Sequence, residues 1–232
     1  MTTAIILAGG LGTRLRSEVP NLPKPMAIVK NRPFLEYLMD YWIEQGVCKF
    51  ILSIGYLSEK IVSHFGGTYK NIPISYSIEK SPLGTGGGLL LSLKKITEEN
   101  VLVLNGDTFF KVNLNDFQNF HTRQNSILSM ALFEFNERNR YGGINLNKNK
   151  KITSIEIKSK QLSGLANGGV CLVKAKEFLN IFKQKINNKC SFEDDLIKAL
   201  IKNKAYVSGK VFTEKFIDIG LPVDYRASSG IV

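Results

Sequence analysis

The sequence predicts an α/β fold, in which helices cover both faces of a mixed, mostly parallel, Rossmann-like sheet. Short apolar runs at 1–7, 47–54 and 101–104 have the length and composition of buried strands. Apolar residues at helical spacing lie between these runs, and this order of strand, helix and strand is typical of parallel βαβ units. Ligands of such sheets bind at the carboxyl ends of the strands, so functional residues are expected where the strands end.

The elements of the first half follow one another regularly. Apolar residues of 34–43 recur at helical spacing, and Gly46 is expected to end that helix. After the strand at 47–54, Ser58 is expected to cap a short helix. A half-buried strand, a glycine-rich turn that leads to a helix, and an apolar strand complete this half, at 72–79, 89–93 and 101–104.

The second half is less regular, but its apolar runs are sufficient to extend the sheet. Strands are expected at 127–135, 142–146, 152–157, 168–173, 205–212 and 216–219, and helices at 176–186 and 191–202. No linker rich in proline, glycine or serine separates the two halves. We therefore expect a single domain over 1–232, in which 126–232 packs onto 1–125 as a second, substrate-binding half.

The composition argues against nucleic-acid and membrane partners. The net charge is +11, from 31 basic against 20 acidic residues, yet the lysines are scattered and form no arginine-rich stripe. Such a positive field attracts small polyanionic substrates. No apolar run approaches the ~20 residues that span a bilayer, and the first residues lack a signal-peptide pattern. Three separated cysteines suit a reducing compartment, so we expect a cytoplasmic protein.

A candidate phosphate site follows the first strand. Gly9, Gly10 and Gly12 allow backbone N–H groups to approach an anion closely. Arg14 can bind phosphate oxygens through two hydrogen bonds, and Lys24 supplies a compact charge between two prolines. Neither the dinucleotide fingerprint nor the P-loop pattern fits this segment. For the glycines alone, a tight turn without a ligand remains an alternative.

Two stretches of this segment, LAGGLGTRL at 7–15 and PKP at 23–25, together resemble the signature of the sugar-1-phosphate nucleotidyltransferases. These enzymes join a nucleoside triphosphate to a sugar 1-phosphate, giving an NDP-sugar and pyrophosphate. The resemblance covers most of the chain. It implies a fold of the GT-A-like kind, nucleotide binding by 1–125 and sugar-phosphate binding by 126–232. It also implies catalytic roles for Arg14 and Lys24, and nucleotide contacts by Leu7, Ala8, Gly9, Gly10, Gly12 and Thr13.

Two aspartates are candidate ligands of a magnesium ion (Mg2+). Asp107 follows the apolar strand at 101–104, and Asp218 is flanked by isoleucines on a short predicted strand. Mg2+ usually binds through one or two carboxylates together with substrate phosphates. A turn aspartate and a buried ion pair are the respective structural alternatives. The resemblance implies that both residues bind the metal and that Asp107 is catalytic, although Leu221 replaces the threonine that the family usually has after Asp218.

A second glycine-rich stretch, 79–88, resembles the family segment that holds the base and the ribose. Without a ligand it would be a flexible loop before a helix. The resemblance implies nucleotide contacts by Glu79, Pro82, Gly84, Thr85 and Gly106.

The second half carries the candidate sugar contacts. The resemblance implies sugar-phosphate binding by Tyr141, Gly142, Lys158, Asn167 and Glu193, with a β-turn at 141–143 and a helix cap at Ser191 as structural alternatives. The clearest departure is Ile157, where the family usually has a glutamate. Glu156 is one residue away and on a strand points to the opposite face, so an unusual sugar specificity is expected.

Within the family, the chain most resembles guanylyltransferases that use GTP and D-glycero-alpha-D-manno-heptose 1-phosphate and supply GDP-heptose for capsule or surface polysaccharide. Mannose-1-phosphate guanylyltransferase, and uridylyl or thymidylyl transfer to glucose 1-phosphate, remain alternatives. A regulatory domain that binds NDP-sugars without turnover is an alternative of another class. The resemblance also implies a homodimer, because members of the family often assemble.

Overall fold

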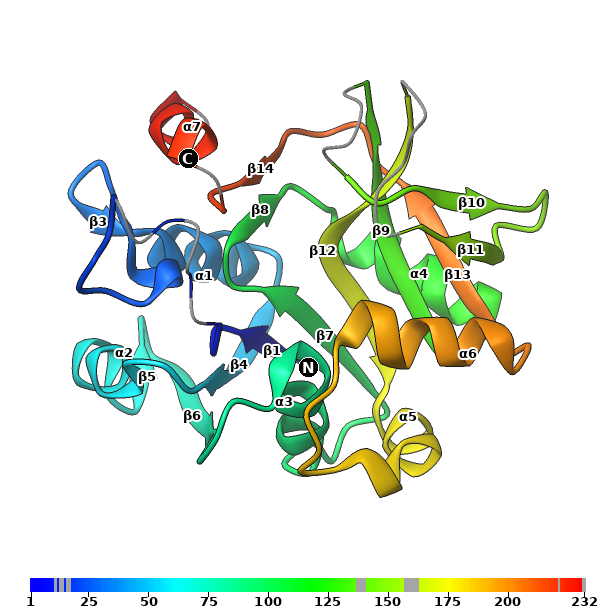
Figure 1. Cartoon of the computed structure of the whole chain (residues 1–232), viewed down its shortest axis with the longest axis horizontal. Helices are drawn as coiled ribbons and strands as arrows, with labels where there is room; N and C mark the ends of the chain where they lie inside the picture. The colour runs from blue at the N-terminus through cyan, green and yellow to red at the C-terminus, as the bar shows by residue number, and fades with distance from the viewer. Residues whose placement is uncertain are drawn as a thin grey trace.

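The structure of the chain, a computed structural model, describes residues 1–10, 12, 15, 18–136, 141–156, 163–220 and 222–230. It contains one large mixed sheet with helices on both faces (Figure 1). Strands of the first half form the parallel part of the sheet, and they are β1 (Thr2–Leu7), β4 (Val47–Ile54), β6 (Ile72–Ile78) and β7 (Asn100–Asn105). The predicted fold class is therefore confirmed.

The order of these strands creates a crevice beside β1. In space the order is β7-β1-β4-β6, so the chain runs outward from β1 through β4 and β6 and then returns across β1 to form β7. The connections that follow β1 and β7 consequently leave toward opposite sides. In open α/β sheets such a reversal marks the usual ligand site, at the carboxyl ends of the strands.

The second half continues the same sheet in mainly antiparallel fashion. The long strand β12 (Gly164–Lys174) pairs antiparallel with the central β7 and with β9 (Leu128–Phe135), and β13 (Val207–Val211) pairs parallel with β9. Two short strands, β10 (Ile144–Leu146) and β11 (Ile152–Ile155), form the far edge. β12 therefore joins the two halves through backbone hydrogen bonds.

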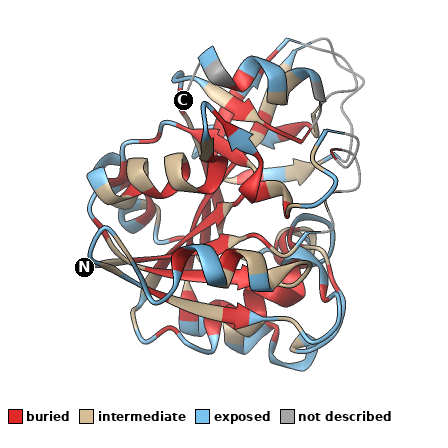
Figure 2. Ribbon diagram, turned by 90° about the vertical axis from the view of Figure 1, so that its left-hand side faces the viewer, coloured by how far each residue is buried: buried red, intermediate tan, exposed pale blue. Residues whose placement is uncertain are grey.

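A hydrophobic core lies on each face of the sheet, as the period-two alternation of strand side chains requires. Ala4 and Ile6 of β1 face one core, and Ile5 faces the other. The first core is covered by α1 (Phe34–Glu44), α2 (Ser58–Phe65) and α4 (Leu114–Gln124), and the second by α3 (Gly84–Leu93), α5 (Ala175–Ile181) and α6 (Lys198–Lys202). Figure 2 shows that buried residues run through the central strands. Each core also contains residues from the second half, for example Phe133 in the first core and Val207 in the second.

Helix α3 begins earlier than the sequence indicates. The glycine-rich stretch was expected to be a turn that leads to a helix at 89–93, but the helix already begins at Gly84. Glycine is needed there because the helix packs directly on the backbone of the second half. A Cβ on Gly86 would lie 2.9 Å from the Ser191 carbonyl carbon, and one on Gly87 would lie 2.7 Å from the Asn188 carbonyl oxygen.

The prediction that Ser58 caps α2 is wrong. Ser58 is the first residue of the helix, and the capping position is occupied by Leu57, which makes no side-chain cap hydrogen bond. Leu57 has a φ of +50°, and the Ser58 N–H donates to the Gly55 carbonyl at 3.2 Å. The chain therefore enters the helix through a tight left-handed turn.

Several elements, most of them short, have no counterpart among the predicted ones. They are the hairpin β2 (Ile28–Val29) and β3 (Arg32–Pro33), β5 (Thr68–Tyr69), β8 (Thr108–Phe110), helix α4, and the C-terminal helix α7 (Pro222–Ala227). Asn113 caps α4, because its side chain accepts a hydrogen bond from the Asp116 N–H. The predicted helix at 191–202 is a π-helical turn, Phe192–Ile197, followed by α6. No helix in the described part of the chain is long and apolar enough to cross a bilayer.

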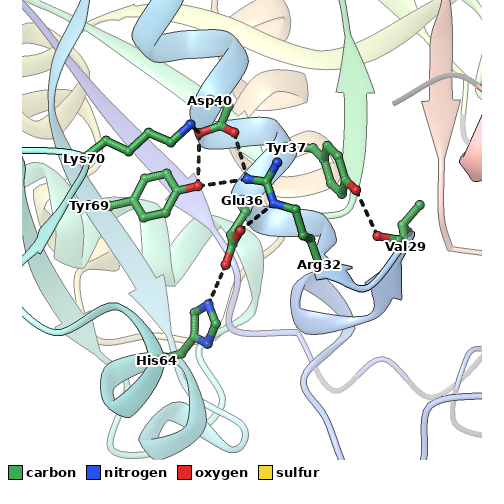
Figure 3. A network of polar contacts seen from close by, with 8 residues as sticks. All are labelled: Val29, Arg32, Glu36, Tyr37, Asp40, His64, Tyr69 and Lys70. Atoms are coloured by element: carbon green, nitrogen blue, oxygen red, sulfur yellow. Dashed lines mark hydrogen bonds and ion pairs between the residues drawn. The ribbon is translucent and has the colours of Figure 1, made fainter.

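A polar network holds the β2–β3 hairpin against α1 and α2 (Figure 3). Arg32 donates to Glu36 and to Asp40, at 2.8 Å in each case, and to the hydroxyl of Tyr69 at 3.1 Å. His64 of α2 contacts the other oxygen of Glu36 at 2.7 Å. Burial raises the pKa of both carboxyls, but their hydrogen bonds, those with Arg32 foremost, outweigh it and lower the pKa. Because the hairpin directly follows the Lys24 turn, this network supports the candidate site.

Candidate active site

Lys24 lies between two carboxylates. Its Nζ is 2.5 Å from Oδ2 of Asp107 and 3.7 Å from Oδ1 of Asp218. The lysine side chain is 10% exposed, whereas those of the two aspartates are 34% and 26% exposed. The ammonium is thus largely buried, while the carboxylates remain partly exposed. The sequence-based expectation that these three residues share one site agrees with this geometry.

Local turns direct Lys24 toward the glycine segment. Lys24 lies in a 3₁₀ turn, Lys24–Met26, which Pro23 precedes in an extended conformation. The N–H of Met26 donates to the Pro23 carbonyl at 2.8 Å. Gly12 has a φ of +58°, which favours glycine, and a Cβ added at Gly12 would be only 3.2 Å from Cβ of Lys24. The lysine therefore approaches the loop that follows β1.

A two-stranded ladder explains why Asp107 and Asp218 meet although they are far apart in the sequence. Strand β14 (Phe216–Asp218) pairs antiparallel with β8, and Asp218 is opposite Thr108. The N–H of Ile219 donates to the Asp107 carbonyl at 3.0 Å. The N–H of Gly220 fixes the carboxylate of Asp218 through a 2.6 Å hydrogen bond.

The chemistry of this pair fits a divalent cation. Two partly exposed carboxylates that face the same ammonium supply the hard oxygen ligands that Mg2+ prefers. Within the described ranges, no group of three or more His, Cys, Asp or Glu residues could hold a metal by itself. Two carboxylates are enough where substrate phosphates and water complete the coordination.

The crevice beside β1 contains a cavity of about 410 Å³. This volume lies within the usual range for small-molecule sites, roughly 300–1,000 Å³. The residues that line it come from the loop after β1, the Lys24 turn, the strand ends, the start of α3 and the second half: Leu7, Ala8, Gly9, Gly10, Gly12, Leu15, Lys24, Pro25, Ser53, Glu79, Pro82, Gly84, Thr85, Gly88, Asn105, Asp107, Lys189 and Gly220. The cavity therefore brings together most of the predicted nucleotide contacts.

Glu79 lies at the end of the cavity formed by the start of α3. It directly follows β6, and its Oε2 accepts a 2.7 Å hydrogen bond from the N–H of Leu83. Burial raises the pKa of this carboxyl, while the hydrogen bond from Leu83 acts in the opposite direction. Glu79 is consequently a partly desolvated hydrogen-bond acceptor at the edge of a nucleotide-sized cavity.

A segment of the second half closes this end of the cavity. The Cys190 carbonyl accepts hydrogen bonds from the N–H groups of Gly86 and Gly87, at 2.9 and 3.3 Å. The hydroxyl oxygen of Thr85 accepts from the N–H of Phe192 at 2.9 Å, so the Thr85 side chain joins the two halves. Lys189 lies on this segment and lines the cavity. No sequence motif indicated Lys189, because its position depends on tertiary packing.

The predicted sugar contacts form a separate group. Nδ2 of Asn167 donates to Oε1 of Glu193 at 2.5 Å, and Oδ1 of Asn167 accepts from the N–H of Gly169 at 3.0 Å. Tyr141 packs against Phe133 and lines another hollow of about 400 Å³. Neither Tyr141, Gly142, Asn167 nor Glu193 lines the cavity beside β1. Gly106 also lies outside its lining, and its N–H donates to the Leu7 carbonyl at 2.9 Å.

Four positions of interest, Thr13, Arg14, Ile157 and Lys158, lie outside the described residues. Their predicted roles, and the consequence of the isoleucine, therefore remain predictions.

The chain is similar to proteins of known activity along almost its whole length. D-glycero-alpha-D-manno-heptose 1-phosphate guanylyltransferase from Aneurinibacillus thermoaerophilus is 43% identical over 225 residues, which cover 96% of this chain and 95% of that protein. The enzyme of the same name from Campylobacter jejuni subsp. jejuni is 41% identical over 222 residues, with 96% of each chain covered.

The fold agrees with a solved structure at similar coverage. The crystal structure of HddC from Yersinia pseudotuberculosis complexed with GMP-PN has a TM-score of 0.85 and 33% sequence identity, over 99% of both chains. The family described as Nucleotidyl transferase matches residues 3–230. Lys24, Asp107 and the glycine loop line one cavity, and Asp218 lies beside Lys24. Together with the match over residues 3–230, this arrangement shows that the chain belongs to the nucleotidyl transferase family.

Proposed function

We propose that this enzyme transfers the guanylyl group of GTP to D-glycero-alpha-D-manno-heptose 1-phosphate, giving GDP-heptose and pyrophosphate. Two relatives with more than 40% identity over nearly their full length carry the corresponding name, and the related HddC structure contains GMP-PN. The observation on which the proposal depends is the position of Lys24 between Asp107 and Asp218, at a cavity that also contains the glycine loop.

The reaction is a direct displacement at phosphorus. A phosphate oxygen of the sugar 1-phosphate attacks the α-phosphorus of GTP, the bond to the bridging oxygen breaks, and pyrophosphate leaves. Such a step depends mainly on alignment and on neutralisation of charge. No side-chain nucleophile or general base is required, because the attacking oxygen is already anionic.

The residues of the nucleotide half supply most of the positive charge. The ammonium of Lys24 and the backbone N–H groups near Gly10 and Gly12 hold the triphosphate and stabilise the charge that develops on it. Arg14 serves the same purpose in this proposal, and Lys158 holds the phosphate of the sugar.

Asp107 and Asp218 hold Mg2+ in this proposal, since both are partly exposed carboxylates that approach the same ammonium, and Asp107 lines the cavity. When bound, a divalent cation neutralises phosphate charge and orients the α-phosphate. The family generally depends on such a metal, and the two carboxylates are the residues of this chain that fit one.

The two halves divide recognition between them. In 1–125, Glu79 accepts hydrogen bonds from the donor edge of the base, and the residues around Gly84 and Thr85 contact the ribose. In 126–232, the hydrogen-bonded pair of Asn167 and Glu193 contacts the sugar hydroxyls, together with Tyr141 and Gly142. We further assign a cytoplasmic location, a homodimer and a role in capsule or surface polysaccharide synthesis to this protein; sedimentation velocity tests the dimer.

A substrate panel tests the proposal. The purified protein is incubated with Mg2+, each of the four NTPs, and heptose, mannose or glucose 1-phosphate, and pyrophosphate release is followed while mass spectrometry identifies the product. GTP with heptose 1-phosphate should give the highest kcat/KM. A higher value with mannose 1-phosphate or with UTP would replace the proposed substrates, and absence of pyrophosphate release with every pair would contradict the enzymatic assignment.

A further inference from the structure

Lys189 is the only lysine from the second half among the residues that line the nucleotide cavity in the described part of the chain. It lies between Asn188 and Cys190, outside the regular helices and strands. No aspartate or glutamate that the structure describes forms an ion pair with it. Its ammonium therefore retains its donors for a ligand.

The backbone of this segment is held firmly. The Cys190 N–H donates to the Leu83 carbonyl at 2.8 Å, and its own carbonyl accepts from the start of α3. On the other side, the Asn188 N–H donates to the Lys185 carbonyl at 3.0 Å. The side chain of Cys190 is buried, whereas Lys189 is exposed toward the cavity. A lysine on a fixed backbone can contribute to selectivity, because less freedom is lost when it binds.

The neighbours of Lys189 place it at the end of the cavity where α3 begins, which the proposed function assigns to the base. Its neighbour Cys190 hydrogen-bonds the backbone of Leu83, Gly86 and Gly87. The carboxylate of Glu79 accepts a hydrogen bond from the N–H of the same Leu83. The Lys24 ammonium, by contrast, lies at the strand ends with Asp107 and Asp218. Among the described residues, the cavity thus has a carboxylate and a lysine without an acidic partner at one end, and a separate charged cluster at the other.

This pair of opposite charges matches the edge of guanine. Guanine presents hydrogen-bond acceptors at O6 and N7, and donors at N1 and its 2-amino group. An ammonium only donates and an ionised carboxylate only accepts. Adenine presents an amino group where guanine has O6, and an acceptor at N1. The ammonium would therefore face a donor of adenine, and the carboxylate would face an acceptor.

Resting on the proposed use of GTP, we propose that Lys189 is a specificity-determining residue, which donates hydrogen bonds to O6 and N7 of guanine while Glu79 accepts from the donor edge. Lys189 belongs to the second half, so the half that binds the sugar phosphate also selects the base. The same pair admits guanine. It excludes adenine, because a donor would face a donor at one side of the base and an acceptor would face an acceptor at the other.

The experiment compares kcat/KM for GTP, 7-deaza-GTP and ATP in three proteins: the wild type, Lys189→Met and Lys185→Met. Lys185 is the matched control, because it is an exposed lysine four residues earlier that does not line the cavity. Methionine keeps an unbranched apolar stem and removes the charge. For Lys189→Met, kcat/KM with GTP should fall about tenfold or more, the scale of one good base contact. The value with ATP should stay the same or rise, and Lys185→Met should behave like the wild type.

A second comparison locates the contact. The loss on mutation should be smaller with 7-deaza-GTP than with GTP, because the analogue already lacks the N7 acceptor. An unchanged ratio of GTP to ATP in Lys189→Met would overturn the inference, as would an equal loss with all nucleotides, which would make Lys189 a general attractor of phosphate. If the wild type itself prefers another NTP, the proposed function fails instead, and the two failures are thereby distinguished.

Discussion

Substitution of Lys24 by methionine tests the charge arrangement at the site most sharply. The variant removes an ammonium that is 2.5 Å from one carboxylate and 3.7 Å from another, on a side chain that is only 10% exposed. Two unit charges about 4 Å apart interact by roughly 4 kcal/mol at the effective dielectric typical of such sites, and desolvation offsets part of this energy. The carboxylates of Asp107 and Asp218 are then left facing each other.

The expected loss in catalysis follows from the role of the ammonium in stabilising phosphate charge. Removal of one such preorganised group typically costs a factor of about 10²–10³ in kcat, or roughly 2.7–4 kcal/mol. We expect kcat at saturating GTP, sugar 1-phosphate and Mg2+ to fall by at least about 10² in Lys24→Met. Pyrophosphate release measures kcat, and circular dichroism with a thermal melt verifies that the variant is folded.

Lys95→Met is the matched control, because Lys95 is an exposed lysine on the same half that does not line the cavity. Its kcat should equal that of the wild type. If folded Lys24→Met retained more than about a tenth of the wild-type kcat, the ammonium would not be the charge stabiliser that typical losses require, and the mechanism would have to do without it.

Three further predictions concern the metal, the supporting network and a buried histidine. Asp107→Asn and Asp218→Asn should each raise the Mg2+ concentration that gives half-maximal activity and lower kcat by about 10², measured by Mg2+ titration. Arg32→Met should lower Tm by several degrees, at about 2–4 °C per kcal/mol for a chain of this size, because it leaves Glu36 and Asp40 without their shared partner (Figure 3). Burial lowers the pKa of His121 to about 4, from about 6.5 in the unfolded chain. The unfolded chain therefore binds the extra proton, so the free energy of unfolding should fall by about 3 kcal/mol as the pH decreases from above 6.5 to about 4.

Each of these has its own control. For Arg32, the comparison is Arg226→Met, since Arg226 is 69% exposed, pairs with Glu18 at the surface and should contribute within about 0.5 kcal/mol. An equal effect of both substitutions on Tm would contradict the role of the network. For His121, which hydrogen-bonds Ser129 and Asn100, the comparison is His121→Gln, because glutamine cannot take up the proton. In this variant the free energy of unfolding should decrease less than in the wild type as the pH falls through the same range. An equal decrease in the variant and the wild type would mean that other groups cause the loss of stability at acid pH. Normal Mg2+ dependence in both aspartate variants would remove these residues from the metal site.

Much of the first half could be predicted because local patterns and the final fold agree there. The strand at 47–54 coincides with β4, and apolar residues at helical spacing located α1 within one residue at its end. The shared location of the glycine loop, Glu79 and Asp107 followed from a general property of parallel sheets, in which strand ends meet at one edge. These predictions needed no knowledge of which distant segments pack together.

The features that escaped prediction depend on tertiary contacts. The start of α3 could not be foreseen, because glycine has a low helix propensity and only the packing of 188–191 against the helix explains its presence. Lys189 reaches the cavity only through the hydrogen bonds of Cys190. The two-residue strands of the hairpin at 28–33 are too short to show alternation, and the hairpin is held by Arg32 and by the hydroxyl of Tyr225, which donates to the Ile28 carbonyl.

The most direct test of the central claim follows the phosphorus atoms of GTP. Wild-type protein with Mg2+ and heptose 1-phosphate is given GTP labelled at the α- or the γ-phosphate, and the same reaction is run with the folded double variant Asp107→Asn/Asp218→Asn. The α label should appear in GDP-heptose and the γ label in pyrophosphate with the wild type, and neither product should form at a comparable rate with the double variant. Transfer of the α label at wild-type speed by the double variant, or no transfer by the wild type, would contradict the account.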